Sequence, residues 1–148
     1  MQPLQTSIRT HRQQLMNDAP RHDTTEGAFS HHGPTLRLAL HGEVVTPFLI
    51  KADTMWSRMR GLLGRGALAP SEGLWITPCN SIHMFFMRFA IDAVFIDERL
   101  QVVKVVEDLK PWRMARGGKF AHSVLELPPG KAAFFNIRVG DKLHIVPN

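Results

Sequence analysis

Cationic and aromatic side chains alternate in one short segment, residues 110–120, which reads KPWRMARGGKF. Cations neutralise phosphate groups and aromatic faces stack on bases, a combination found in sites for nucleotides and single-stranded nucleic acid. The segment lacks the Gly-Lys-Ser/Thr ending of a phosphate-binding loop. We therefore predict an anion-binding loop, for a phosphorylated small molecule or nucleic acid; the alternative is a solvated loop with its aromatic rings packed on the core. The residues concerned are Lys110, Trp112, Arg113, Arg116, Lys119 and Phe120.

A second group of reactive side chains lies in and after the most hydrophobic stretch, residues 80–97, which reads NSIHMFFMRFAIDAVFID. Strand geometry over residues 82–89 and 91–97 places His83 and Asp92 on apolar faces, where a buried polar group without a partner costs a few kcal/mol. We expect both to be hydrogen-bonded anchors inside the sheet, bonded to each other or to backbone. The alternative is a hydrolytic or metal-dependent enzyme centred on His83 and Asp92, with Glu126 as a third group.

The spacing of these residues matches no recognised metal site, because neither His-x-x-x-His nor Cys-x-x-Cys occurs. The chain also lacks a Gly-x-Ser-x-Gly turn and a dinucleotide fingerprint. The sequence therefore implies no metal and no cofactor, and an enzyme is the weaker hypothesis. A third hypothesis is a protein-interaction domain that uses an apolar patch from the Met- and Phe-rich strands.

One segment is predicted to form the main helix, at about residues 54–63. Asp53 or Thr54 is a good N-cap, and apolar residues follow at helical spacing until two glycines end the pattern. Arg65 lies at the end of this helix. It would extend the anion site if it faced the same side as Arg113 and Arg116; the alternative is a solvated charge in a salt bridge.

The rest of the domain reads as strands, since short apolar runs alternate with turn residues. Residues 35–52 predict a hairpin with its bend at His41-Gly42, and Pro47 suggests an edge position for the second strand. Residues 110–119 predict a glycine-containing loop, and KAAFFN a helical turn. Short connections favour antiparallel pairing. We predict a β-rich α+β fold of about seven strands, in a mostly antiparallel sheet or partly closed barrel. Further strands are expected at 73–79, 82–89, 91–97, 99–109, 122–130 and 140–147.

Composition is typical of one globular domain. The chain has 148 residues and is 44% hydrophobic, and no run approaches the ~18 apolar residues of a membrane helix. The net charge of +5 falls entirely on residues 35–148, because three arginines balance three acids in residues 1–34. We predict a flexible tail at 1–34 and a single domain at 35–148. A lone cysteine, Cys79, and an opening segment without the apolar stretch of a secretory signal predict a cytoplasmic protein.

Several motifs in this order resemble one protein family. They are RGLLGR (60–65), GLWI (73–76), SIHMFFMRFAIDAVFID (81–97), VLELPPG (124–130) and GDKL (140–143). The set is similar to the uncharacterised family called domain of unknown function 192, or uncharacterised protein family 0127, over about residues 37–146. The resemblance implies a compact β-rich α+β domain that stands alone, with no established activity.

Overall fold

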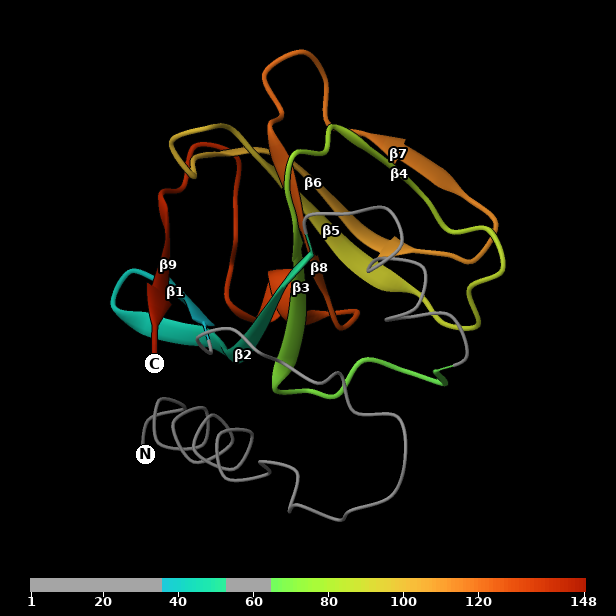
Figure 1. The fold of residues 1–148 in the computed structure, drawn as a ribbon, viewed down its shortest axis with the longest axis horizontal. Coiled ribbons are helices and arrows are strands. Elements are labelled where there is room, and N and C mark those ends of the chain that lie inside the picture. Colours follow the sequence, from blue (N-terminus) through green and yellow to red (C-terminus); the bar gives the residue numbers. More distant parts are fainter. Residues whose placement is uncertain (1–35, 53–64) are drawn as a thin grey trace, which may run out of the picture. The chain divides into compact units, whose positions relative to one another are not determined.

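A curled seven-stranded sheet dominates the fold, in the order β6-β5-β8-β3-β2-β1-β9 (Figure 1). The structure, a computed structural model, describes residues 36–52 and 65–148. Every neighbouring pair in this sheet is antiparallel except β2 and β3, which run parallel. The predicted β-rich, mostly antiparallel fold is therefore confirmed. The strands are β1 (Leu36–Leu40), β2 (Glu43–Ala52), β3 (Glu72–Ile76), β5 (Ile91–Ile96), β6 (Val102–Leu109), β8 (Ser123–Leu127) and β9 (Leu143–Pro147).

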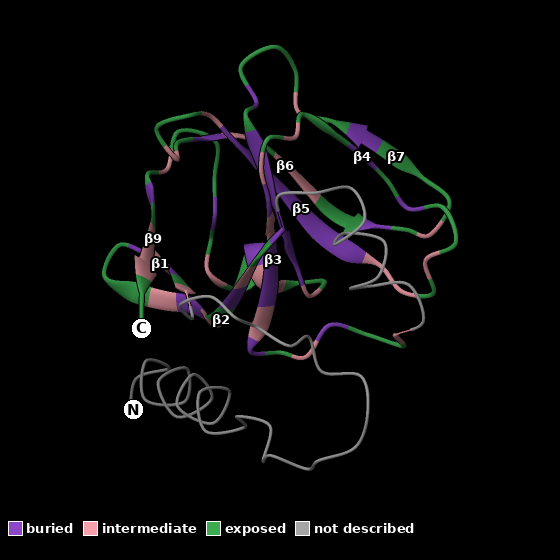
Figure 2. Ribbon diagram, viewed as in Figure 1, coloured by how far each residue is buried: buried purple, intermediate pink, exposed green. Residues whose placement is uncertain are grey.

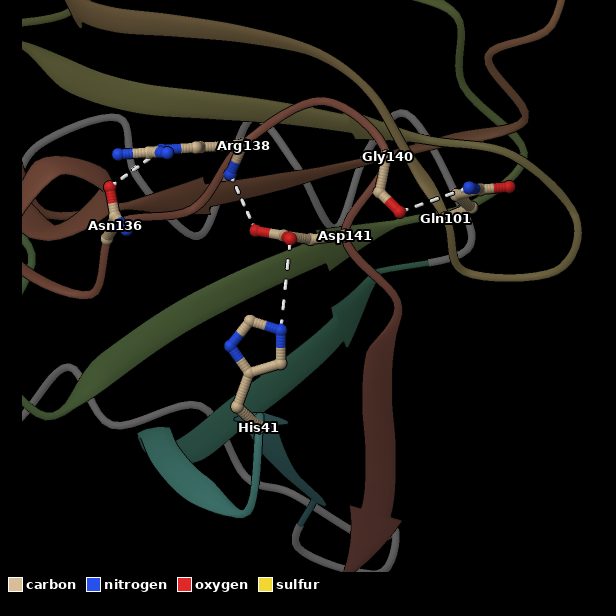
Figure 3. A network of polar contacts seen from close by, with 6 residues as sticks. All are labelled: His41, Gln101, Asn136, Arg138, Gly140 and Asp141. Atoms are coloured by element: carbon tan, nitrogen blue, oxygen red, sulfur yellow. Dashed lines mark hydrogen bonds and ion pairs between the residues drawn. The ribbon is translucent and has the colours of Figure 1, made fainter.

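The two edge strands of this sheet, β6 and β9, meet at one end. Gln101 and Lys142, just before these strands, form an antiparallel bridge, and the Leu143 N–H donates to the Leu100 carbonyl at 3.0 Å. Figure 3 shows the polar contacts at this closure, where Gln101 Nε2 donates to the Gly140 carbonyl at 3.1 Å. Figure 3 also shows Asp141 facing His41 of the β1–β2 turn, at 3.8 Å. The sheet is thus a partly closed barrel, as predicted.

The β1–β2 hairpin follows the predicted pattern except at Pro47. Its turn places His41 at φ 51° and Gly42 at φ 80°, and positive φ at both central residues suits the right-handed twist of a hairpin. The predicted edge position for β2 is wrong, because β2 lies between β1 and β3. A register shift between the pairs Leu36–Leu49 and Leu38–Thr46 interrupts the ladder around Pro47. An irregularity of this kind accommodates a residue that has no N–H to donate.

The central strands β5 and β8 are buried on both faces, and Figure 2 shows β5 buried along its whole length. Successive side chains of a strand point to opposite faces, so β5 supplies Val94 to one core and Phe95 to the other. The prediction of a buried strand at residues 91–97 is confirmed for 91–96. The first core fills the barrel with Leu38, Leu40, Val45, Leu49, Val94, Ile96, Val102, Leu125, Leu127 and Leu143. The second includes Ile76, Ile82, Met84, Ala93, Phe95, Leu109, Ala115 and Val124.

The second core is covered by a two-stranded ribbon of β4 (Ser81–His83) and β7 (Met114–Arg116). Two predictions fail here. The loop expected over residues 110–119 contains a strand, and the strand expected over 82–89 ends at His83. Met84 still pairs with the other segment, because its N–H donates to the Arg113 carbonyl and its carbonyl accepts from the Trp112 N–H, both at 2.8 Å. The chain then turns: the Met87 N–H donates to the Met84 carbonyl at 3.3 Å, and Phe86 has φ 64°.

The predicted helical turn is the short helix α3 (Lys131–Phe134). The Lys131 ammonium donates to the Pro70 carbonyl, and burial lowers its pKa to about 8. Between about pH 8 and 10.5 the unfolded chain therefore binds this proton and the folded chain releases it, so folding stability rises with pH across that interval. We expect urea unfolding at several pH values to show the wild type gaining stability relative to Lys131→Met from pH 8 to 10.5. A constant difference would contradict the lowered pKa.

Two predictions lie outside the described residues: the helix at 54–63 and the tail at 1–34. The described residues belong to one compact unit by their contacts. Within the parts of the chain that the structure describes, no helix has both the length and the apolarity needed to cross a membrane.

Candidate functional site

The outer face of the β4–β7 ribbon carries polar and cationic side chains. Pairing aligns Ile82 with Ala115, and both are buried against the sheet. The residues on either side of them point outward by strand alternation and are exposed: Ser81, His83, Met114 and Arg116. The expected burial of His83 is therefore wrong, because its strand covers the sheet rather than lying within it.

The tip of the ribbon holds two aromatic residues in strained backbone conformations. Phe86 has φ 64° and Trp112 has φ 67°, in the left-handed region that bulky residues avoid. Both side chains are largely exposed, at 69% for Phe86 and 59% for Trp112. Strain of this kind costs about 1–3 kcal/mol per residue and concentrates at functional sites. The position of this tip on the surface makes it a candidate site.

Four rings at this tip contact one another in sequence, and we call them the aromatic row: His83, Phe85, Trp112 and Phe86. His83 stacks on Phe85 with ring centroids 4.8 Å apart and an interplanar angle of 25°. Trp112 follows at 6.0 Å from Phe85, and Phe86 lies 4.9 Å from Trp112. Exposed apolar surface of this extent on a folded domain indicates a binding site more often than scattered single residues do.

Three exposed cations follow Trp112 in the sequence: Arg113, Arg116 and Lys119. We call them the basic flank. None of the ion pairs among residues 36–52 and 65–148 involves them. Lys119 instead lies over the Phe120 ring, 4.8 Å from its centroid. The fourth predicted cation, Lys110, differs, because it pairs with Asp108 at 2.7 Å. The predicted loop therefore presents three uncompensated positive charges and the exposed Trp112 ring.

Arg65 does not join this group. Its guanidinium pairs with Glu72 at 2.8 Å, at the beginning of β3, whereas β4 follows the end of that strand. Its charge is balanced there, so the alternative expectation of a salt bridge describes Arg65 correctly.

The three residues of the enzyme hypothesis are not brought together. Asp92 lies on the strand face that supplies Val94 to the barrel interior, and Glu126 lies on the face that supplies Val124 to the second core. His83 is exposed on the ribbon. Among the described residues, no group of three or more His, Cys, Asp or Glu side chains could hold a metal ion. The geometry therefore offers no shared acid–base or metal site for these residues.

Asp92 instead performs the structural role predicted for it. It is fully buried, and its carboxylate accepts the Asp108 N–H at Oδ1 and the Ala132 N–H at Oδ2, both at 2.9 Å. The first bond satisfies a backbone group where β6 bulges: Ile91 pairs with Leu109 but Ala93 with Val106, so two residues of β6 face Asp92 alone. Asp92 thus joins β5, β6 and α3.

Sequence reasoning missed Phe85 and Phe86 as site residues. Their apolar run MFFM was interpreted as a strand with both faces covered, because hydrophobic residues are usually buried. The run itself could have indicated their exposure. A strand that is apolar on both faces needs a covering layer on each face to be buried. In the part of the chain that the structure describes, the run follows β4 at the tip of the ribbon, and Phe85 and Phe86 are exposed there.

The fold and site define a class: a partly closed, mostly antiparallel barrel whose outer ribbon presents an aromatic row beside a basic flank. The family model DUF192, described as "Uncharacterized ACR", matches residues 38–145. The chain belongs to this family. A UPF0127 protein of Thermococcus sibiricus is 35% identical over 112 residues, spanning 69% of this chain and 68% of the relative. Another, of Thermococcus kodakarensis, is 32% identical over 117 residues, spanning 74% and 68%.

Two solved structures share the fold at 20% identity. A "putative transcription regulator" from Sinorhizobium meliloti 1021 has a TM-score of 0.66, covering 80% of this chain and 97% of its own. A protein of unknown function from Novosphingobium aromaticivorans DSM 12444 has a TM-score of 0.63, covering 82% and 93%. At this identity the likeness concerns the fold alone.

Proposed function

We propose that the protein is a binding module for an anionic, phosphate-bearing ligand, either a phosphorylated small molecule or nucleic acid. The observation that carries this proposal is the basic flank: three exposed cations without carboxylate partners among the described residues, beside exposed aromatic rings. Cations left uncompensated in one place attract anions, and an aromatic face adds affinity for a ligand that carries a base. The Sinorhizobium meliloti protein is named a "putative transcription regulator", and a nucleic-acid ligand here would agree with that name.

Arg116 of the basic flank is held by the ribbon rather than by a flexible loop. Arg116 pairs with Ser81 in the ladder, and its carbonyl accepts the Lys104 ammonium at 2.8 Å. The next N–H, of Gly117, donates to the Asn80 carbonyl at 2.8 Å. Because its backbone is fixed in this way, Arg116 loses less conformational entropy when it binds a ligand than an arginine on a free loop would. We place this activity in the cytoplasm, a location that the single cysteine suits.

Arg113→Ala and Arg116→Ala are each expected to weaken binding of inorganic tripolyphosphate and of ADP about tenfold. Each change removes one charge-assisted contact of about 1.5 kcal/mol or more, and 1.4 kcal/mol is a factor of ten. Isothermal titration calorimetry at low and moderate salt measures this loss, and raising the salt should weaken wild-type binding.

The matched control is Arg37→Ala, which removes the same formal charge from an exposed position on β1. It should leave both affinities nearly unchanged. If Arg37→Ala lowers affinity as much as Arg116→Ala does, the protein attracts anions only through its net charge and the proposed site is wrong. Wild-type protein that binds neither tripolyphosphate nor ADP would also contradict the proposal for small phosphorylated ligands.

A further inference from the structure

The geometry points to a single-stranded nucleic acid as the ligand of this surface, with bases stacked on the aromatic row and phosphates paired with the basic flank. This inference rests on the proposed function and narrows it. Four features of the ribbon support it: the length of the row, the spacing of the cations, the exposure of the aromatic side chains, and the backbone strain at two of the rings.

The aromatic row is longer than one nucleotide needs. Its rings follow one another with centroid separations of 4.8, 6.0 and 4.9 Å, from His83 on β4 to Phe86 at the tip. One base has a face comparable to one or two such rings, so a mononucleotide would leave much of the row uncovered. Successive bases of a strand would cover it, as on the stacking platforms of other single-strand binders.

The cations are distributed along the ribbon rather than gathered at one point. Arg113 lies just before β7 and Arg116 ends it, so the two are three residues apart and their Cα atoms lie up to about 10 Å apart. Lys119 lies further along the same segment. A small phosphate group is usually held by donors that converge on it, whereas spaced donors suit successive phosphates of a strand.

Exposed aromatic side chains favour unpaired over paired nucleic acid. In a duplex each base is covered by its neighbours, so protein rings can stack only on bases that are free or splayed out. Trp112 and Phe86 are among the most exposed large apolar residues that the structure describes, at 59% and 69%. A duplex could use the basic flank and leave the rings unused.

Strain indicates that the rings are retained for a role other than folding. Phe86 and Trp112 occupy left-handed positions that glycine would fill without steric strain, and both residues are more than half exposed, at 69% and 59%. Glycine at either position should therefore preserve the fold or stabilise it. A protein partner is the competing occupant of such a row, but an apolar partner surface would gain nothing from three uncompensated cations, whereas a polyanion is complementary to both parts.

Fluorescence anisotropy of a labelled single-stranded oligothymidylate of about twelve nucleotides tests the inference on the full chain. Trp112→Gly and Phe86→Gly are each expected to weaken binding about five- to a hundredfold, the loss of one base–aromatic stack. Their unfolding midpoints in urea should equal or exceed that of the wild type. The same sequence annealed to its complement should bind more weakly than the single strand.

Phe85→Ala and Phe48→Ala form a matched pair, because the two side chains are 38% and 37% exposed and only Phe85 belongs to the aromatic row. Phe85→Ala should weaken binding and Phe48→Ala should not. Arginine variants that weaken oligonucleotide binding while the glycine variants do not would overturn the stacking inference and leave the anion-binding proposal intact. Absence of binding to oligonucleotide, tripolyphosphate and ADP would overturn both. Self-association of the wild type that Trp112→Gly abolishes, without oligonucleotide binding, would assign the row to a protein contact.

Discussion

Asp92→Ala will lower the free energy of unfolding by about 3 to 5 kcal/mol, because two hydrogen bonds to a charged acceptor contribute about 1.5 to 3 kcal/mol each. Asp92 is fully buried, and its two oxygens accept the N–H groups of Asp108 and Ala132. Removing the carboxylate leaves the Ala132 N–H buried without a partner, since Ala132 is itself 0% exposed. Urea unfolding should show a lower midpoint with an unchanged m value.

Asp97→Ala is the control, because Asp97 also accepts two backbone N–H groups, from Arg99 at 2.8 Å and Gln101 at 2.9 Å. Those bonds lie at an exposed turn, where water replaces the carboxylate, so the expected loss is about 1 kcal/mol. Equal losses at the two positions would mean that burial adds nothing to the Asp92 network, and its interpretation as an anchor between β5, β6 and α3 would be wrong.

The barrel could be predicted from the sequence because its strands obey local rules. Residues 91–96 are apolar apart from Asp92 and are buried on both faces. The dipeptide His41-Gly42 indicates a tight hairpin in the sequence, and both residues have positive φ in the structure. The role of Pro47 was misjudged, since a proline excludes a regular ladder but permits an irregular one inside a sheet. That distinction depends on the neighbouring strand, which is remote in sequence.

The sequence predicted only part of the candidate site. Trp112 and the arginines of the ribbon carry their chemistry in their residue types, so the sequence pointed to them directly. Phe85 and Phe86 could not be identified, because an apolar residue indicates a core or a binding surface equally until its covering layer is known. The prediction for Arg65 failed for the opposite reason: its partner Glu72 lies seven residues away at the start of β3, after a turn whose geometry the sequence does not define.

The position of the ribbon depends on Gly117, which follows Arg116 directly. A Cβ atom at Gly117 would lie 2.4 Å from Phe95 Cδ1 and 2.4 Å from the Ala121 Cβ. Phe95 is fully buried and its ring cannot move aside without disturbing the second core. We therefore expect Gly117→Ala to lower the free energy of unfolding by about 3 kcal/mol, the upper part of the usual range for overpacking a core.

The same change is expected to affect binding, because relieving the clash would lift the ribbon from the sheet and displace Arg116. Gly118→Ala is the matched control: nothing lies within 4 Å of its added Cβ, and its φ of +90° costs only about 1–2 kcal/mol of backbone strain. Urea unfolding compares the stabilities, and tripolyphosphate titration of the fully folded variants compares the sites. Gly117→Ala should lose more than Gly118→Ala in both measurements. If the two variants unfold alike, the ribbon does not rest on Phe95 closely enough to position the basic flank.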